Sequence, residues 1–214
     1  MPNAEPLADP RDDIGAFGGL MREMRACKEA RTCPMLTSPA YYFEPNPATT
    51  PEWRAAGLYT GPIDRRVAFV AESPGKQFAS VNQPAPSTCW NKTPQDERFR
   101  RLREQYGFLN CYLTNSIKCG VRSGGRHTDA EMGTCRGFLV RELNLIRPCL
   151  ILAVGGNAFR TLAEDVLPLL DFPAQIFRIT HYSARRDVWA RWHREFADVN
   201  SILGRVSGRG ARAD

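Results

Sequence analysis

Three polar residues follow short apolar segments of the chain, and their side chains suit the recognition of a planar ring and the stabilisation of a leaving anion. Asn115 lies in LTNSIKC, and its carboxamide can bind the edge of a planar heterocycle through one acceptor and one donor. His181, one of three histidines, lies in ITHYSA and can donate a hydrogen bond to developing negative charge. Glu72 opens the turn ESPG directly after an apolar segment. The structural alternatives are an Asx turn or helix cap for Asn115, a structural imidazole for His181 and a plain strand-to-helix connection for the turn.

The segments that carry these residues have the pattern of buried strands joined by helices. Strands are predicted over 66–71, 110–115, 149–155 and 175–180. Helices are predicted over 19–30, 94–107, 128–148, 157–167 and 188–203. The intervening segments 37–64, 76–94 and 118–127 are interpreted as loops. This alternation predicts a three-layer α/β/α fold with a central four-stranded, mainly parallel sheet.

A parallel sheet would gather the polar residues at one place. The carboxyl ends of parallel strands lie at the same edge, where open α/β sheets bind ligands. The residues expected together at this edge are Glu72 to Gly75, Asn115, Gly155 to Asn157 and His181. The sequence therefore predicts a ligand site built from several strand ends.

The size and composition of the chain fit a single globular domain. It has 214 residues, 43% hydrophobic and 24% charged. We expect a flexible N-terminal arm over 1–18, one α/β domain over 19–204 and a basic flexible tail over 205–214. No apolar run reaches the roughly 18 residues that span a bilayer, and the start lacks the apolar core of a secretory signal. These features predict a cytoplasmic monomer with no membrane partner.

Positive charge is concentrated in three parts of the chain. The net charge is +6, and basic residues gather in 98–105, 181–194 and 204–214. The second group is interleaved with Tyr182, Trp189 and Trp192, and this mixture of cations and aromatic rings favours nucleic-acid binding. For the first group the alternative is a solvated helix face.

The seven cysteines favour thiols or metal ligands over a disulfide framework, because their number is odd and no secretory signal is present. Cys111 and Cys149 lie in predicted strands and suit core thiols. Thiolates of a second set could hold zinc or an iron–sulfur cluster: Cys27, Cys33, Cys119 and Cys135.

Four motifs, in this order, resemble those of a known family. FVAESPGKQ, YLTNSIKC, C-x-x-F-L-x-x-E-L-x-L-I-R-P followed by ILAVGGNAF, and THYSA are similar to the motif set of the uracil-DNA glycosylase superfamily. The nearest branch is the family 4 type, which carries an iron–sulfur cluster. The resemblance extends from about residue 25 to about residue 195. It implies the superfamily's fold and a DNA glycosylase, which flips a nucleotide out of DNA and hydrolyses its N-glycosidic bond.

The resemblance also implies roles for individual residues. Asn115 would recognise the Watson–Crick edge, His181 would donate to O2 of the leaving pyrimidine, and Glu72 would orient the attacking water or the turn itself. Further substrate contacts would come from Ser73, Pro74, Gly75, Gln77 and a ring under the base, Trp90 or Phe78, which are core aromatics in the alternative interpretation. DNA contacts would come from Ser183, Arg185 and Arg186, which would bind phosphates or fill the gap left by the flipped base. A structural [4Fe-4S] cluster would be held by Cys27, Cys33, Cys119 and Cys135, with zinc as the alternative.

The chain departs from the family pattern on the substrate side. Ala71 stands where the family's turn begins with glycine, Tyr182 stands where proline follows the histidine, and Ser73 stands where the most efficient superfamily members carry aspartate. The first cysteine pair is spaced C-x5-C rather than C-x2-C. The base therefore stays open between uracil and a modified pyrimidine such as glucosylated hydroxymethylcytosine, which some superfamily members excise as antiviral defence. A non-catalytic DNA-binding module and a cysteine-rich metal protein are the alternatives to an enzyme.

Overall fold

The computed structural model describes residues 20, 23, 24, 27, 36–39, 64–73, 94–108, 111–121, 129–181 and 187–210. The strands are β1 (Leu36–Pro39), β2 (Asp64–Ala71), β3 (Cys111–Asn115), β4 (Cys119–Val121), β5 (Leu150–Val154) and β6 (Gln175–Ile179). The helices are α4 (Pro94–Gln105), α5 (Asp129–Ile146), α6 (Gly156–Thr161) and α7 (Val188–Gly210). A π-helical turn (Leu162–Val166) and a 3₁₀ turn (Leu167–Leu169) connect α6 to β6.

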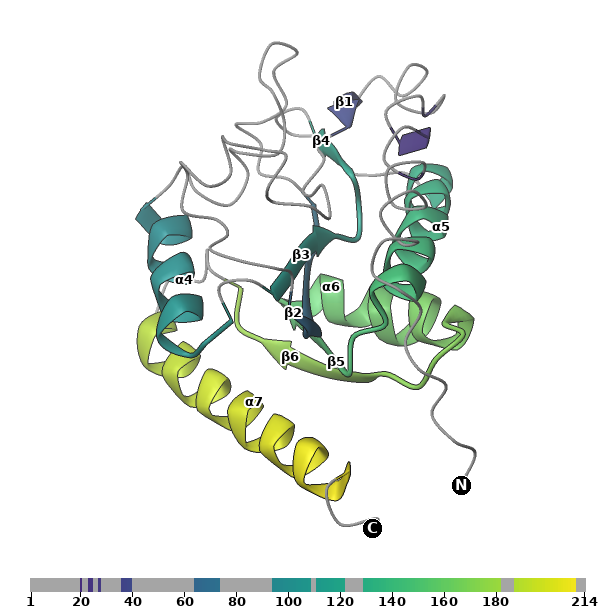
Figure 1. Cartoon of the computed structure of the whole chain (residues 1–214). Helices are drawn as coiled ribbons and strands as arrows, with labels where there is room; N and C mark the ends of the chain where they lie inside the picture. Colours follow the sequence, from purple (N-terminus) through teal and green to yellow (C-terminus); the bar gives the residue numbers. More distant parts are fainter. Residues whose placement is uncertain are drawn as a thin grey trace, which may run out of the picture.

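Four strands form a parallel sheet in the order β3-β2-β5-β6 (Figure 1). At the carboxyl ends, Ala71 of β2 pairs with Asn115 of β3, and Val154 of β5 pairs with Ile179 of β6. The prediction of a three-layer fold around a four-stranded, mainly parallel sheet is confirmed. Each of the four predicted strands begins and ends within two residues of the observed strand. The agreement is good because strands buried on both faces are continuous apolar segments, as every residue of β5 is buried here.

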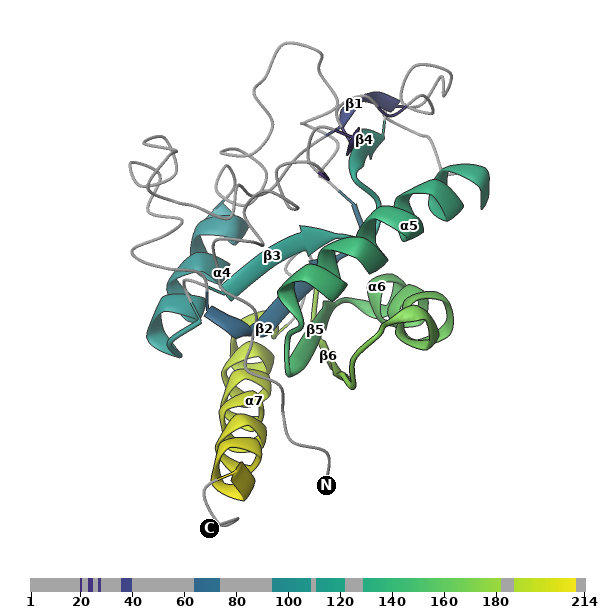
Figure 2. The same cartoon turned by 45° about the vertical axis from the view of Figure 1, so that its right-hand side comes forward.

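Helices cover both faces of this sheet (Figures 1 and 2). On one face Phe69 of β2 packs against Phe99 of α4 and Phe196 of α7, with ring centroids 5.8 and 5.9 Å apart. On the opposite face lies α5, whose Glu142 accepts a hydrogen bond from Tyr112 of β3. Successive side chains of a strand point to opposite faces, so each apolar strand contributes to two cores.

A small second sheet differs from the sequence-based expectation. The segments that contain β1 and β4 are interpreted from the sequence mainly as loops, but the two strands pair antiparallel. β4 begins four residues after β3 ends, so the pair lies beyond the carboxyl end of β3 (Figure 1). Strands of three and four residues are too short to carry a hydrophobic period, which is why the sequence did not indicate them.

The last helix is longer than the sequence predicts. Gly204 is a typical helix stop signal, and a basic tail is expected from residue 205, but α7 continues to Gly210. A glycine inside a helix weakens it by only about 1 kcal/mol, so the stop signal is not decisive. Within the part of the chain that the structure describes, no helix has the length and apolarity needed to cross a membrane.

Candidate functional site

The carboxyl ends of the parallel strands bring the three predicted catalytic residues to one edge of the sheet. Asn115 is the last residue of β3, Glu72 directly follows β2, and His181 lies two residues after β6. The chain passes from β2 through α4 to β3 on one side, and then through α5 to β5 on the other side of β2. This reversal makes the carboxyl end of β2 the switch point at which doubly wound sheets bind ligands. Asn115 is buried, His181 is half-buried and Glu72 is exposed.

The loops after β2 and β3 are joined by backbone hydrogen bonds. The N–H of Ser116 donates to the carbonyl of Ala71 at 2.7 Å, and the N–H of Ile117 donates to the carbonyl of Glu72 at 2.8 Å. The Ser116 hydroxyl adds a bond of 3.2 Å to the same Ala71 carbonyl. The positions of Asn115 and Glu72 are therefore fixed relative to each other.

The carboxylate of Glu72 connects this pair to the next strand. Asn157, in the first turn of α6, donates from Nδ2 to Oε1 of Glu72 at 3.0 Å. This bond crosses from the end of β2 to the segment after β5. The hydrogen bond therefore orients the Glu72 carboxylate at the carboxyl ends of the strands.

His181 is positioned by the residues that hold Thr180 and by Gly155. Glu195 of α7 accepts hydrogen bonds from both the N–H and the hydroxyl of Thr180, at 2.8 and 2.6 Å. The indole N–H of Trp192 donates to the Thr180 carbonyl at 2.8 Å. Gly155 closely approaches the histidine, because a Cβ built at Gly155 would lie 3.2 Å from His181 Cβ and 3.3 Å from His181 Cδ2. The backbone before His181 is therefore held by α7 through Thr180, and the side chain of His181 lies directly against Gly155 at the end of β5.

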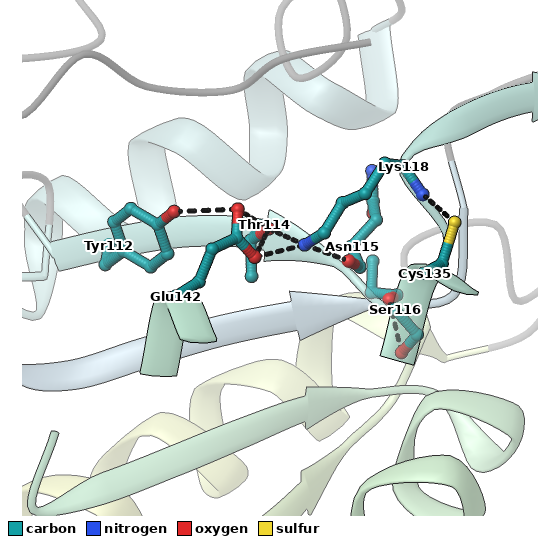
Figure 3. Close-up of polar contacts among 8 residues, drawn as sticks. Tyr112, Thr114, Asn115, Ser116, Lys118, Cys135 and Glu142 are labelled. Atoms are coloured by element: carbon teal, nitrogen blue, oxygen red, sulfur yellow. Dashed lines mark hydrogen bonds and ion pairs between the residues drawn. The ribbon is translucent and has the colours of Figure 1, made fainter. Parts of the chain in front are cut away.

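A buried polar network lies behind Asn115, between β3 and α5 (Figure 3). Lys118 forms an ion pair with Glu142, and both side chains are almost completely inaccessible to solvent. The Lys118 ammonium also donates to Thr114 Oγ1 and to the carbonyl oxygen of Asn115, each at 2.7 Å. Glu142 accepts from the hydroxyl groups of Tyr112 and Thr114 at 3.1 Å.

Several predicted site residues lie outside the described part of the chain. They are Pro74, Gly75, Gln77, Phe78, Trp90, Ser183, Arg185, Arg186 and Cys33, so their roles remain predictions. The aromatic residues among the basic segment 181–194 differ in exposure. Trp192 is 2% exposed and belongs to the core, whereas Trp189 is 45% exposed and is available to a partner.

The predicted metal ligands are described only in part. Cys135 of α5 is buried and accepts a hydrogen bond from the Lys118 N–H at 3.4 Å. Burial raises the pKa of the Cys135 thiol, the hydrogen bond and charge of Lys118 oppose this shift, and the neighbouring Cys27 adds to it. Cys119 directly follows Lys118. Among the described side chains no group of three or more potential metal ligands occurs, but the side chains of Cys33 and Cys119 are not in that set.

The segment that carries Cys27 is docked onto α5. Leu20 and Met24 are buried in the main core. Arg141 of α5 donates to both carboxylate oxygens of Glu23, and this hydrogen-bonded partner lowers the pKa of Glu23. Two thiols on separate segments, one of them buried and accepting an N–H, fit the donors of a thiolate-bound metal centre.

Three positioning residues were not identified from the sequence: Lys118, Glu142 and Glu195. One signal could have pointed to Glu142, since it interrupts an apolar face of α5 that otherwise contains Leu139, Leu143 and Ile146, all buried. A carboxylate on a buried helix face requires a charged or hydroxyl partner on the packed element. Glu195 gave no comparable signal, because its role depends on a contact between distant segments. Gly155 was expected at this edge, but its close approach to His181 was not predicted.

The fold and the site define a doubly wound α/β protein with an amide, an imidazole and a carboxylate at the carboxyl ends of its parallel strands. A family model described as the uracil DNA glycosylase superfamily matches residues 58–203. Because this match covers more than half of the chain, the protein belongs to the uracil DNA glycosylase superfamily.

Individual relatives are consistent with this assignment. The chain is 26% identical over 98 residues to the type-4 uracil-DNA glycosylase of Thermotoga maritima, covering 46% of this chain and 49% of that one. It is 28% identical over 105 residues to the type-4 uracil-DNA glycosylase of Archaeoglobus fulgidus, covering 49% of each chain. The chain thus spans about half the length of the curated relatives it matches.

A solved structure supports the fold. The crystal structure of wild-type Pedobacter heparinus SMUG2 superposes with a TM-score of 0.50 at 11% sequence identity, covering 86% of this chain and 97% of that one. At this level of identity the similarity concerns the fold alone.

Proposed function

We propose that the protein is a DNA glycosylase that binds a flipped-out pyrimidine nucleotide and hydrolyses its N-glycosidic bond, leaving an abasic site. One observation carries the proposal: an amide, Asn115, and an imidazole, His181, lie at the carboxyl ends of the two outer strands of one parallel sheet. Neighbouring strands are about 4.8 Å apart, so these strand ends are separated by about 14 Å. An asparagine, a six-membered ring and a histidine, joined by two hydrogen bonds, fill such a span.

The two side chains would act on opposite sides of the base. Asn115 pairs with N3–H and O4 of uracil, or, with its amide rotated, with N3 and the exocyclic amine of a cytosine ring. His181 donates to O2, where negative charge builds as the glycosidic bond breaks. Such a donor stabilises the transition state more than the ground state, which is the condition for catalysis.

The turn after β2 would complete the reaction on the sugar side. Glu72, held by Asn157, orients the attacking water or the turn. Ser73 is a poor general base, so water activation is weak and the reaction depends on stabilising a dissociative transition state. Pro74, Gly75, Gln77 and an aromatic face from Trp90 or Phe78 would complete the pocket.

DNA would be held by cationic and aromatic groups near His181. Ser183, Arg185 and Arg186 directly follow the histidine and are assigned to phosphate contacts or to the gap left by the flipped nucleotide. The exposed Trp189 at the start of α7 offers a face on which a base can stack. The net charge of +6 favours the approach of DNA.

We place this protein in the cytoplasm as a monomer.

We assign Cys27, Cys33, Cys119 and Cys135 to a structural [4Fe-4S] cluster, which would tie the N-terminal segment to α5 and β4. The purified protein should be brown, absorb near about 400 nm and contain about four iron atoms and four sulfides per chain. Cys135→Ser should lose the iron and colour, whereas Cys149→Ser, which changes an exposed cysteine outside this set, should keep both. Bound zinc in place of iron would contradict the cluster and support a thiolate zinc site.

Base release across a panel of DNA substrates tests the proposed function. Oligonucleotides carrying uracil, hypoxanthine, xanthine, hydroxymethylcytosine or glucosylated hydroxymethylcytosine are incubated, single- and double-stranded, and abasic sites are counted after strand cleavage at those sites. We expect the wild-type protein to release uracil or a modified pyrimidine. We expect the Asn115→Ala variant to release no base. Release of uracil alone supports a role in repair, and release of the glucosylated base supports antiviral defence. Salt-sensitive DNA binding without release of any base would identify a non-catalytic module and overturn the proposal.

A further inference from the structure

We infer that Lys118 is a positioning residue that fixes the direction of the Asn115 side chain by binding the carbonyl of the same residue. The inference rests on the proposed function, in which the Asn115 amide recognises the base. Lys118 itself is buried behind the strand and is not assigned to the substrate.

The peptide unit after Asn115 is held at both ends. Its N–H, which belongs to Ser116, donates to the carbonyl of Ala71 in the neighbouring strand β2 at 2.7 Å. Its C=O belongs to Asn115, and the C=O and N–H of a trans peptide point in opposite directions. The carbonyl therefore points away from β2, and among the strands that the structure describes β3 has no neighbour on that side. The Lys118 ammonium supplies the donor there, 2.7 Å from the oxygen.

The other contacts of the Lys118 ammonium keep it at the carbonyl oxygen of Asn115. Its other two contacts go to Thr114 Oγ1 and to the Glu142 carboxylate, so the three donors of the ammonium match three acceptors (Figure 3). A lysine that gave up the Asn115 carbonyl would leave a polar group unpaired in a buried site, which is unfavourable. The lysine therefore holds the peptide plane in one orientation.

Helix α5 contacts Lys118 at two points. Cys135 accepts from the Lys118 N–H at 3.4 Å, and Glu142 binds its ammonium. These two helical residues are seven positions apart, which places them on the same face of α5, about 10 Å apart along the axis. The backbone and the side-chain end of Lys118 are thus both fixed to one rigid element, and through Lys118 that element sets the position of Asn115.

Fixing the peptide plane matters because the Cα–Cβ bond of Asn115 turns with it. A base-recognising amide must meet two ring atoms at once, and displacements of about 1 Å can slow an enzymatic reaction by roughly 100-fold. Within the described part of the chain, β3 pairs with β2 alone in this sheet, so no second strand defines the geometry of its carboxyl end. The hydrogen bond from Lys118 takes the place of one from such a strand.

The test separates positioning from stability by replacing the whole ion pair with apolar groups. Lys118→Met alone leaves the buried Glu142 carboxylate without its cationic partner and is expected to destabilise the fold. The double variant Lys118→Met/Glu142→Leu removes both charges, and such apolar replacements of buried pairs are often neutral or stabilising. We expect its Tm to lie above that of Lys118→Met but below that of the wild type, because the Asn115 carbonyl and the hydroxyl groups of Thr114 and Tyr112 lose bonds to the two replaced residues. Its single-turnover rate of base release should remain about 10- to 100-fold reduced, with little change in the Kd for DNA that carries an abasic-site analogue.

Tyr112→Phe is the matched control. It removes one hydrogen bond to Glu142 from the same network but leaves the Lys118 donor to Asn115 in place. This variant should lower the Tm while keeping a rate within about twofold of the wild type. Hydrogen exchange at the Ser116 amide should accelerate in the double variant and stay slow in Tyr112→Phe, because only the former frees the peptide unit.

The possible outcomes distinguish this inference from the function on which it rests. A stable double variant that keeps the wild-type rate, or a Tyr112→Phe variant as slow as the double variant, would overturn the positioning role while the glycosylase activity stands. A wild-type protein that releases no base from any substrate of the panel would overturn the proposed function and the inference with it.

Discussion

His181→Ala is expected to slow single-turnover base release by about 100- to 1,000-fold, the usual effect of removing one donor to a developing oxyanion. The fold should be little affected, because the backbone before His181 is held through Thr180 by Glu195 and Trp192, and none of these bonds uses the imidazole. DNA affinity should also change little, since the donor acts mainly on charge that appears in the transition state. Rates are measured with enzyme in excess over a labelled substrate oligonucleotide.

A sharper test asks how the loss of rate in His181→Ala depends on the leaving group. An electron-withdrawing fluorine at C5 of uracil stabilises the departing anion, so less stabilisation is required from the protein. If uracil is the substrate, the wild-type to His181→Ala rate ratio should therefore be smaller for 5-fluorouracil than for uracil. Equal ratios for the two bases would show that His181 acts on something other than leaving-group charge, such as binding or water placement.

A second histidine provides the control. His193 lies on α7, where its Nδ1 lies 3.0 Å from the Tyr106 hydroxyl and its ring contacts Trp189. His193→Ala should lower stability slightly and leave the rate near that of the wild type. A loss comparable to that of His181→Ala would show that the rate responds to disturbance of α7 rather than to a missing donor at the edge.

The sequence was sufficient for the parts of the site that local pattern determines. The four strands are short, apolar segments, and parallel strands share an edge, so the common location of Glu72, Asn115 and His181 follows from secondary structure and topology alone. The chemistry of an amide and an imidazole then suggests what such an edge can bind. Nothing beyond residue type, order and the rules for parallel sheets was required for these steps.

The residues that hold the site in place could not be predicted in the same way. Lys118 is three positions after Asn115, but its role depends on Glu142, 24 residues further along the chain. Glu195 binds Thr180 across 15 residues, and Asn157 binds Glu72 across 85. Such contacts depend on helix rotation and strand register, which are set by the packing of the whole core. A single sequence indicates where a charged residue is unusual, as at Glu142, but not which partner satisfies it.

Gly155→Ala is expected to reduce both stability and activity, because this position combines a special backbone conformation with a close approach to His181. Its backbone angles, φ 96° and ψ 170°, lie in a region that is essentially restricted to glycine. An alanine there should lower the free energy of unfolding by about 1 to 3 kcal/mol. Its Cβ would also lie 3.2 Å from His181 Cβ, so the histidine must shift. We expect base release to slow by about tenfold or more in protein that remains folded.

The neighbouring glycine is the matched control for this substitution. Gly156 begins α6, and a Cβ built there has no atom within 4 Å among those that the structure describes. Gly156→Ala should therefore be neutral or slightly stabilising, as replacement of glycine by alanine reduces the entropy of the unfolded chain. Chemical denaturation followed by circular dichroism measures both variants.

A double-variant cycle then shows whether the loss of rate at Gly155 acts through His181. If the alanine slows base release only by displacing the imidazole, Gly155→Ala/His181→Ala should be no slower than His181→Ala alone, because the displaced group is already missing. The stability loss from the backbone should persist in the double variant, since it arises from φ and not from the histidine. If the two losses of rate instead multiplied, the close approach between Gly155 and His181 would have no part in placing the donor.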